Sequence, residues 1–135
     1  MSPKKIKFRS IDKEKYKIYL KKANDFYETM LRAYQEGNWN SVGLEGVHCA
    51  ISAVDALMIY QKGIRCASED HKDSVEFFAQ NIEGPESKHY ASTFRRIVSK
   101  KNLVEYEDRN FTAKEAEEIL KRAERFLNWV KQQIR

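Results

Sequence analysis

Residues 47–60 read V-H-C-A-I-S-A-V-D-A-L-M-I-Y, and they determine the architecture of the chain. Their apolar side chains fall on nearly every face of a helix, which is typical of a helix that other elements surround. A glycine at Gly63 ends the pattern, as glycines commonly end helices. We therefore expect a central, deeply buried helix from about residue 40 to residue 62.

On either side of this segment, the first and last helices each carry one apolar stripe. In residues 12–36 and in residues 112–134, apolar side chains recur with 4-3-4-3-4 spacing, which lines one helical face. Thr112 and Glu115 have the spacing of a capping box, which marks the start of the last helix. The stripes consist of Tyr16, Leu20, Ala23, Tyr27, Met30 and Tyr34 in the first helix, and of Ala116, Leu120, Ala123, Leu127, Val130 and Ile134 in the last.

Two further helices fill the middle of the chain. One is expected from a cap at Ser68 to the break E-G-P-E at residues 83–86, and the other from Ser87 to Lys101. Strand signals are nearly absent. Because the connections are short, neighbouring helices should be antiparallel. The sequence thus predicts an all-α fold, an antiparallel up-and-down bundle of four main helices plus a shorter fifth, with residues 12–135 forming one domain.

Composition narrows the functional classes. The chain has 135 residues, of which 41% are hydrophobic and 33% charged. Since no 18-residue run is apolar, we expect no membrane association. Its two cysteines form no metal or redox motif, which fits a cytoplasmic protein. The three histidines lack ligand spacing, so we expect neither a metal nor a cofactor.

The net charge of +5 is concentrated at one end of the chain. Residues 1–22 hold nine basic and two acidic side chains, and the rest of the chain is slightly acidic. We expect residues 1–11 to form a basic N-terminal tail. Such a tail either contacts phosphate or serves only as a solvated segment, and lysines outnumber the arginines that favour bidentate phosphate contacts.

A polar stripe crosses the central helix at 4-3-4-3 spacing. It consists of Ser41, Glu45, His48, Ser52 and Asp55. Facing water, it would be the outer face of an amphipathic helix; facing other helices or a second copy, it would be a buried network or a ligand site. A nucleophilic triad is disfavoured, because side chains on one helix project in parallel rather than converging.

Gly43 and Gly46 stand near the expected start of the same helix, where glycine costs roughly 1 kcal/mol relative to alanine. We expect that the helix begins late or irregularly there. The alternative is the close approach of another backbone or of a ligand.

Three segments together resemble the HEPN family. The first segment is G-N-W-N at residues 37–40, which leads into the central helix and its end at Gly63. The second is Asp70-His71, which opens the third helix. The third is K-N-L-V-E-Y-E-D-R at residues 101–109, followed by the capping box and A-E-R-F-L-N-W-V. The resemblance covers about residues 12–134. It implies a small helical bundle whose members accompany nucleotidyltransferases or act as ribonucleases, usually as homodimers with a composite site.

The catalytic signature of that family is an arginine followed after four to six residues by a histidine, which together cleave RNA. Here Arg109-Asn110 begins like the signature, but Lys114 stands where a histidine belongs and no histidine follows. Arg65 and His71 satisfy the count, although they lie between the second and third helices. The resemblance therefore implies a non-enzymatic accessory protein that binds a nucleotide or nucleic acid; the alternatives are a dimeric ribonuclease using Arg65 and His71, and a purely structural interaction domain.

The candidate ligand site collects polar residues that an antiparallel bundle brings near one another. Arg65 or Lys101 would supply positive charge for a phosphate. In the alternative interpretation, Asp55 pairs with a cation to satisfy the core and the Tyr106 hydroxyl is bonded within the fold. The candidate residues are His48, Ser52, Asp55, Arg65, His71, Lys101 and Tyr106.

Overall fold

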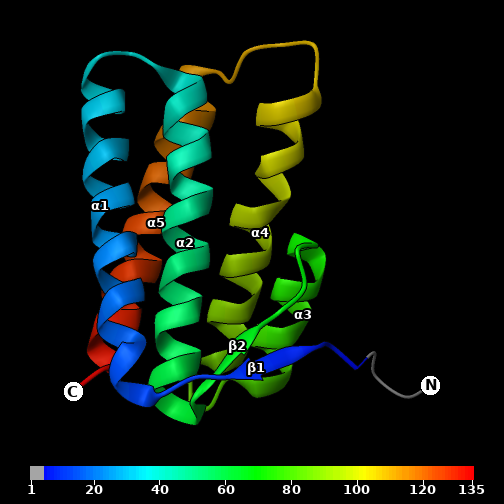
Figure 1. Ribbon diagram of the computed structural model, residues 1–135. Helices are drawn as coiled ribbons and strands as arrows, with labels where there is room; N and C mark the ends of the chain where they lie inside the picture. Colours follow the sequence, from blue (N-terminus) through cyan, green and yellow to red (C-terminus); the bar gives the residue numbers. More distant parts are fainter. Residues whose placement is uncertain (1–4) are drawn as a thin grey trace.

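The computed structural model describes residues 5–135 and confirms an all-α bundle of five helices (Figure 1). The helices are α1 (Tyr16–Gln35), α2 (Trp39–Lys62), α3 (His71–Asn81), α4 (Ser87–Tyr106) and α5 (Ala113–Gln133), and a 3-10 turn, η1 (Lys13–Lys15), precedes α1. At 11 residues, α3 is the short helix; the other four have 20 to 24. Both hydrogen bonds of the predicted capping box at Thr112 are present.

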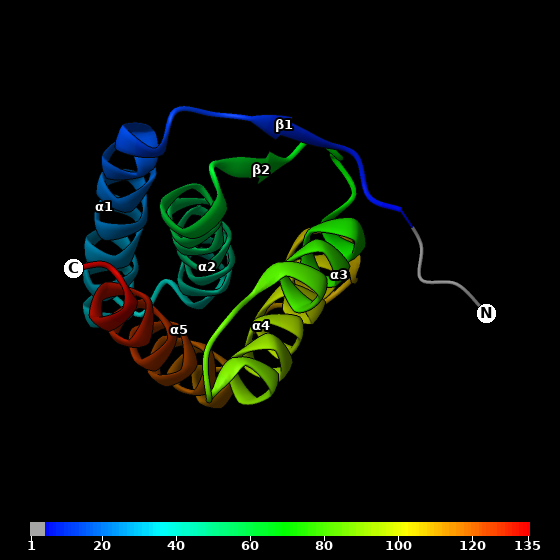
Figure 2. The same ribbon diagram turned by 90° about the horizontal axis from the view of Figure 1, so that it is seen from below.

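Helix α2 occupies the centre of the bundle, as residues 47–60 predicted. Viewed along its axis, α1, α5 and the α3–α4 pair surround it on three sides, and a short two-stranded sheet crosses the fourth (Figure 2). By length and composition α2 would suffice to cross a membrane, yet 78% of its most apolar window is buried inside the bundle. In this fold its apolar character serves the core.

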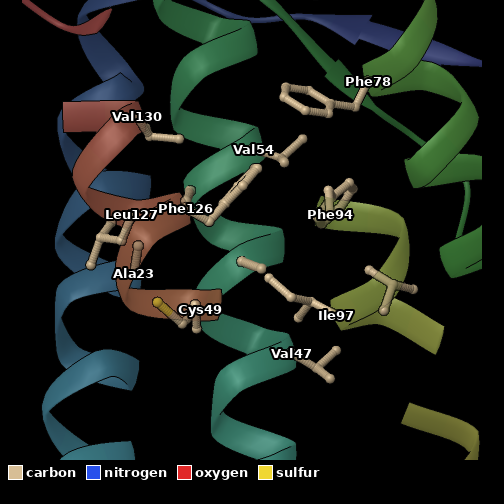
Figure 3. Close-up of a cluster of buried hydrophobic side chains, with 14 of the residues drawn as sticks. Ala23, Val47, Cys49, Val54, Phe78, Phe94, Ile97, Phe126, Leu127 and Val130 are labelled. Carbon is tan, nitrogen blue, oxygen red and sulfur yellow. The ribbon is translucent and has the colours of Figure 1, made fainter. Parts of the chain in front are cut away.

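The core has two differently packed halves. Between α1, α2 and α5 the fully buried side chains are mostly small or aliphatic, among them Ala23, Cys49 and Leu127 (Figure 3). Where α3, α4 and α5 meet, aromatic rings fill the space. Phe78 and Phe94 lie with their centroids 5.5 Å apart and at a steep angle. This is the edge-to-face geometry that aromatic pairs favour.

The small sheet was not predicted. Strand β1 (Phe8–Ser10), in the expected tail, pairs antiparallel with β2 (Ile64–Cys66), which lies between the second and third expected helices. Two other boundaries also differ. The cap of α3 is Asp70 rather than Ser68, because the Asp70 carboxylate accepts the Lys72 N–H at 2.9 Å. Helix α4 continues five residues beyond Lys101, to Tyr106.

The segment expected to be a tail therefore contains ordered structure in its second half. Ile6 is buried at 9% exposure, and the ring of Phe8 packs against that of Phe77 on α3. Residues 1–4 of the expected tail lie outside the described residues. Strands β1 and β2 together form a strap across the lower end of α2 (Figures 1 and 2).

The two glycines of α2 lie within a regular helix, so the expectation of a late or irregular start is wrong. A Cβ added to Gly43 would lie 2.7 Å from Val104, and one added to Gly46 would lie 3.0 Å from Ile119. A methyl group at Gly43 would force Val104 to move, and one at Gly46 would require Ile119 to shift by a few tenths of an ångström. The glycines therefore let side chains of α4 and α5 approach the α2 backbone closely.

Candidate functional site

The polar stripe of α2 runs from solvent into the protein. Ser41 at its start is exposed, Glu45 and His48 are half-buried, and Ser52 and Asp55 are each only 8% exposed. The stripe therefore becomes progressively less accessible toward the strap. Its buried end needs polar partners, since an uncompensated charge away from water is costly.

Asp55 finds its partner on the strap. The Arg65 Nε of β2 donates to Asp55 Oδ2 at 3.1 Å, and the guanidinium lies 5.0 Å from the ring centroid of Tyr19 on α1. Burial raises the pKa of Asp55 to about 6, although Arg65 and Lys22 act in the opposite direction. For Arg65 burial works against the charge, but Asp55 outweighs it and raises the pKa of the guanidinium. At neutral pH the Asp55 carboxylate and the Arg65 guanidinium therefore form an ion pair.

In the described part of the chain, the ion pair leaves the terminal nitrogens of the Arg65 guanidinium without a hydrogen-bond acceptor. Among residues 5–135, Asp55 is the hydrogen-bond acceptor of the guanidinium and contacts only Nε, so the two terminal nitrogens have no acceptor. Both strands of the strap contribute an arginine, because the register places Arg9 of β1 opposite Arg65. Directly opposed residues share one face of a sheet, and like charges in such a pair repel each other.

Both arginines line a cavity of about 540 Å³, which we call the strap pocket. Its lining residues come from the strap, α2, the segment that follows the strap and the start of α3. Its lining consists of Arg9, Ile51, Asp55, Arg65, Cys66, Ala67, Ser68, Glu69, His71 and Ser74. Drug-sized ligands commonly occupy cavities of roughly 300–1,000 Å³, so the volume suits a small organic molecule.

His71, the first residue of α3, stands at the far side of the strap pocket. Burial and the electrostatic influence of the neighbouring Lys101 and His48 lower its pKa below the ordinary value of 6.5. The imidazole is therefore neutral at pH 7, when one ring nitrogen donates a hydrogen bond and the other accepts one. No group of three or more His, Cys, Asp or Glu side chains among residues 5–135 is arranged to hold a metal ion.

A second cavity, of about 510 Å³, adjoins the first between α3 and α4, and we call it the interhelix pocket. Glu69 and His71 line both cavities. The interhelix pocket is lined by Glu69, Asp70, His71, Lys72, Val75, Glu76, Arg95, Val98, Ser99, Lys101, Asn102 and Tyr106.

The seven candidate residues thus divide into three groups. Asp55, Arg65 and His71 meet in the strap pocket, whereas Lys101 and Tyr106 line the interhelix pocket, where His71 joins them. His48 and Ser52 line neither. The ring centroid of His48 lies 5.6 Å from that of Phe26 on α1.

Arg9, Tyr19 and Glu69 belong to this region but were not among the candidates. Arg9 was assigned to the tail, and its place opposite Arg65 depends on strand pairing between distant segments. Tyr19 contacts Arg65 across two different elements. The only sequence signal for Arg9 is a three-residue alternation, F-R-S, which is too short to indicate a strand.

Comparison with known proteins agrees with this fold. The family model of the HEPN domain matches residues 16–133 of the chain, which is most of its length. A search of curated proteins found no match to this sequence.

Proposed function

Since this chain belongs to the HEPN domain family, we propose that it is a non-catalytic member that binds the phosphate of a nucleotide in the strap pocket. The observation that carries the proposal is the cross-strand pair Arg9–Arg65 facing that pocket. A phosphate between the two guanidinium groups would relieve their repulsion. It would also supply acceptors for the free terminal nitrogens of Arg65, which form a fork that matches phosphate oxygens.

Asp55 has a positioning role in this proposal. It holds Arg65 through Nε and leaves the phosphate-facing edge of the guanidinium free. The Tyr19 ring supports the same guanidinium from the side of α1, 5.0 Å away. Since an arginine held in place loses less side-chain entropy on binding, the pocket is preorganised for an anion.

Replacing Arg65 by alanine is expected to weaken ATP binding roughly 10- to 150-fold, the range expected for losing a hydrogen bond to a charged group. Arg9→Ala should act in the same direction, and it removes no side-chain hydrogen bond that the structure shows within residues 5–135. Affinities are measured by isothermal titration calorimetry at low salt, with circular dichroism to verify folding. Arg125→Ala is the matched control, since Arg125 is an exposed arginine of α5 that lines neither pocket. Unchanged affinity in both strap variants would refute the proposal.

The second candidate function is RNA cleavage, favoured by two observations: Arg65 and His71 line the same pocket, and His71 is neutral at pH 7. In such a reaction the imidazole would take the proton of a 2′-hydroxyl, which attacks phosphorus as the 5′-oxygen leaves. At the position in the sequence where the family signature is expected, by contrast, the Arg109 guanidinium is already engaged in an ion pair. Its two terminal nitrogens bond both carboxylate oxygens of Glu115 at 2.8 Å.

On the leading proposal, a single-stranded RNA incubated with excess protein stays intact. The assay compares the wild type with His71→Ala, and His89→Ala serves as the control because His89 is exposed on α4. Cleavage that His71→Ala abolishes and His89→Ala preserves would replace the binding proposal with a ribonuclease.

Homodimer formation and a nucleotidyltransferase partner belong to the same proposal and rest on the family alone. A cytoplasmic location is proposed with them and rests on the cysteine pattern. The sequence also shows apolar side chains beyond one core face, Tyr19, Phe26 and Trp39, which are compatible with a dimer interface. In the structure they lie against Arg65, His48 and Tyr34 of the same chain, so they offer no separate support for a dimer. Native mass spectrometry of gently purified protein measures subunit number and any co-purified nucleotide together. If the purified protein carries no ligand and binds neither ATP nor RNA, the remaining interpretation is a structural protein-interaction domain.

A further inference from the structure

The interhelix pocket exists because α3 and α4 differ in length. Helix α3 has 11 residues and α4 has 20, and the two pack against each other. At about 1.5 Å per residue, α3 covers only about half of its neighbour. The last turns of α4 extend past the start of α3 (Figure 1), and the cavity lies at this step.

The floor of this pocket is apolar. Val75 of α3 and Val98 of α4 line it and are 7% and 8% exposed, so each shows only a small part of its side chain to the cavity. In this it differs from the strap pocket, where two arginines and a buried carboxylate line the wall. The interhelix pocket thus combines an apolar floor with charged and polar side chains around it, whereas the strap pocket has two arginines in its wall.

An exposed aromatic ring stands at the rim. Tyr106, the last residue of α4, lines the cavity and is 72% exposed. The Lys101 ammonium lies 5.9 Å from its ring centroid and is itself held by Glu105 at 2.9 Å. A ring so placed is available for stacking against a planar ligand.

One polar side chain of the pocket that forms no hydrogen bond within residues 5–135 is an amide. Among residues 5–135 the Asn102 side chain makes no hydrogen bond, although it lines the cavity together with Tyr106. A carboxamide offers a donor and an acceptor side by side. Adenine presents the complementary pair at N6 and N7, which asparagine reads bidentately in nucleic-acid complexes.

We propose that the interhelix pocket binds the base of an adenine nucleotide, with the ring over Val75 and Val98, stacked on Tyr106 and read by Asn102. This rests on the proposed function, because the phosphates of the same molecule occupy the strap pocket. Glu69 and His71, which line both cavities, then flank the ribose, whose hydroxyls a carboxylate and a neutral imidazole can bond. The ligand class is thereby narrowed from any phosphate to an adenosine phosphate.

The test compares ATP with inorganic tripolyphosphate, which has the phosphates and no base, by calorimetry on the intact chain. Wild type should bind ATP more than tenfold more tightly than tripolyphosphate. Tyr106→Ala should weaken ATP binding roughly 5- to 150-fold, the effect of losing one base–aromatic stack, and leave tripolyphosphate binding unchanged. Tyr106→Phe, which keeps the ring, should restore ATP binding. Asn102→Ala should reduce the preference for ATP over UTP, whereas Asn128→Ala, at an exposed asparagine of α5, should not.

The experiment distinguishes failure of the base pocket from failure of the phosphate site. If wild type binds ATP and tripolyphosphate equally and Tyr106→Ala changes neither, the base pocket is refuted while the strap pocket stands. If wild type binds neither probe, the phosphate site is refuted and the base pocket with it. Both tested positions are exposed, so the variants are expected to fold.

Discussion

Replacing Phe126 by alanine is expected to lower the free energy of unfolding by about 3–5 kcal/mol, the typical cost of removing a buried phenylalanine side chain. Phe126 is fully buried on α5, and its ring centroid lies 5.9 Å from those of Phe78 and Trp129 and 5.7 Å from that of Phe94. The substitution removes the ring that joins α3, α4 and α5 and leaves a cavity that the neighbouring rings cannot fill. Urea denaturation followed by circular dichroism measures the loss.

Phe8→Ala is the matched control for this experiment. Phe8 is the same residue type but is 55% exposed on β1. Its removal should therefore cost less than about 1 kcal/mol. Equal losses for the two variants would mean that the aromatic cluster contributes no more than the strap surface, and the description of the core would then be wrong.

The second large effect is a pH dependence centred on Asp55. Its pKa of about 6 in the folded protein exceeds the value of 3.8 expected in the unfolded chain, because the carboxyl is buried. The folded state thus binds the proton more tightly than the unfolded state does. The contribution of this difference to the free energy of unfolding is fully present below pH 3.8 and is lost as the pH rises through 6. Above that pH, Asp55 causes no further change in the free energy of unfolding. The loss amounts to about 3 kcal/mol.

Asp55→Asn removes the titrating group, so the variant should lack this loss. The free energy of unfolding is measured for both proteins between pH 4.5 and 7.5, and the wild-type value minus the variant value should fall across this range. Taking the difference cancels His71, whose lowered pKa changes stability in the opposite direction near pH 6. Glu115 has a pKa of about 2 and is ionised throughout the range. Parallel curves for the two proteins would show that Asp55 is not buried as described.

The helices could be predicted because their determinants are local. The 4-3 spacing of α5 and the Thr112–Glu115 capping box lie within one element, and the structure contains both bonds of that box. The strap could not be predicted, since three-residue strands carry almost no periodicity and their pairing depends on the folded bundle. For the same reason the end of α4 was missed: Val104 packs against Gly43, a contact between segments far apart in the sequence.

In the candidate site, too, features set by neighbouring residues could be predicted, and features set by contacts between distant segments could not. Ser52 and Asp55 could be placed together because they share one face of α2, and Arg65 and His71 because they flank the next connection. That the residues around them line two cavities rather than one could not be foreseen. It depends on the lengths of α3 and α4 and on the position of His71 between the cavities. Arg9 enters only through the register of the strap.

The strap also imposes an order of events during synthesis. Strand β1 precedes α1 and α2 in the chain, but its partner β2 is more than fifty residues downstream. While the ribosome makes the intervening helices, the Arg9 segment has no strand to pair with, and Arg65 does not yet exist. The phosphate-facing pair is therefore completed only after the α1–α2 hairpin and β2 have emerged. A nascent chain stalled before residue 64 would contain the central helix and no strap pocket.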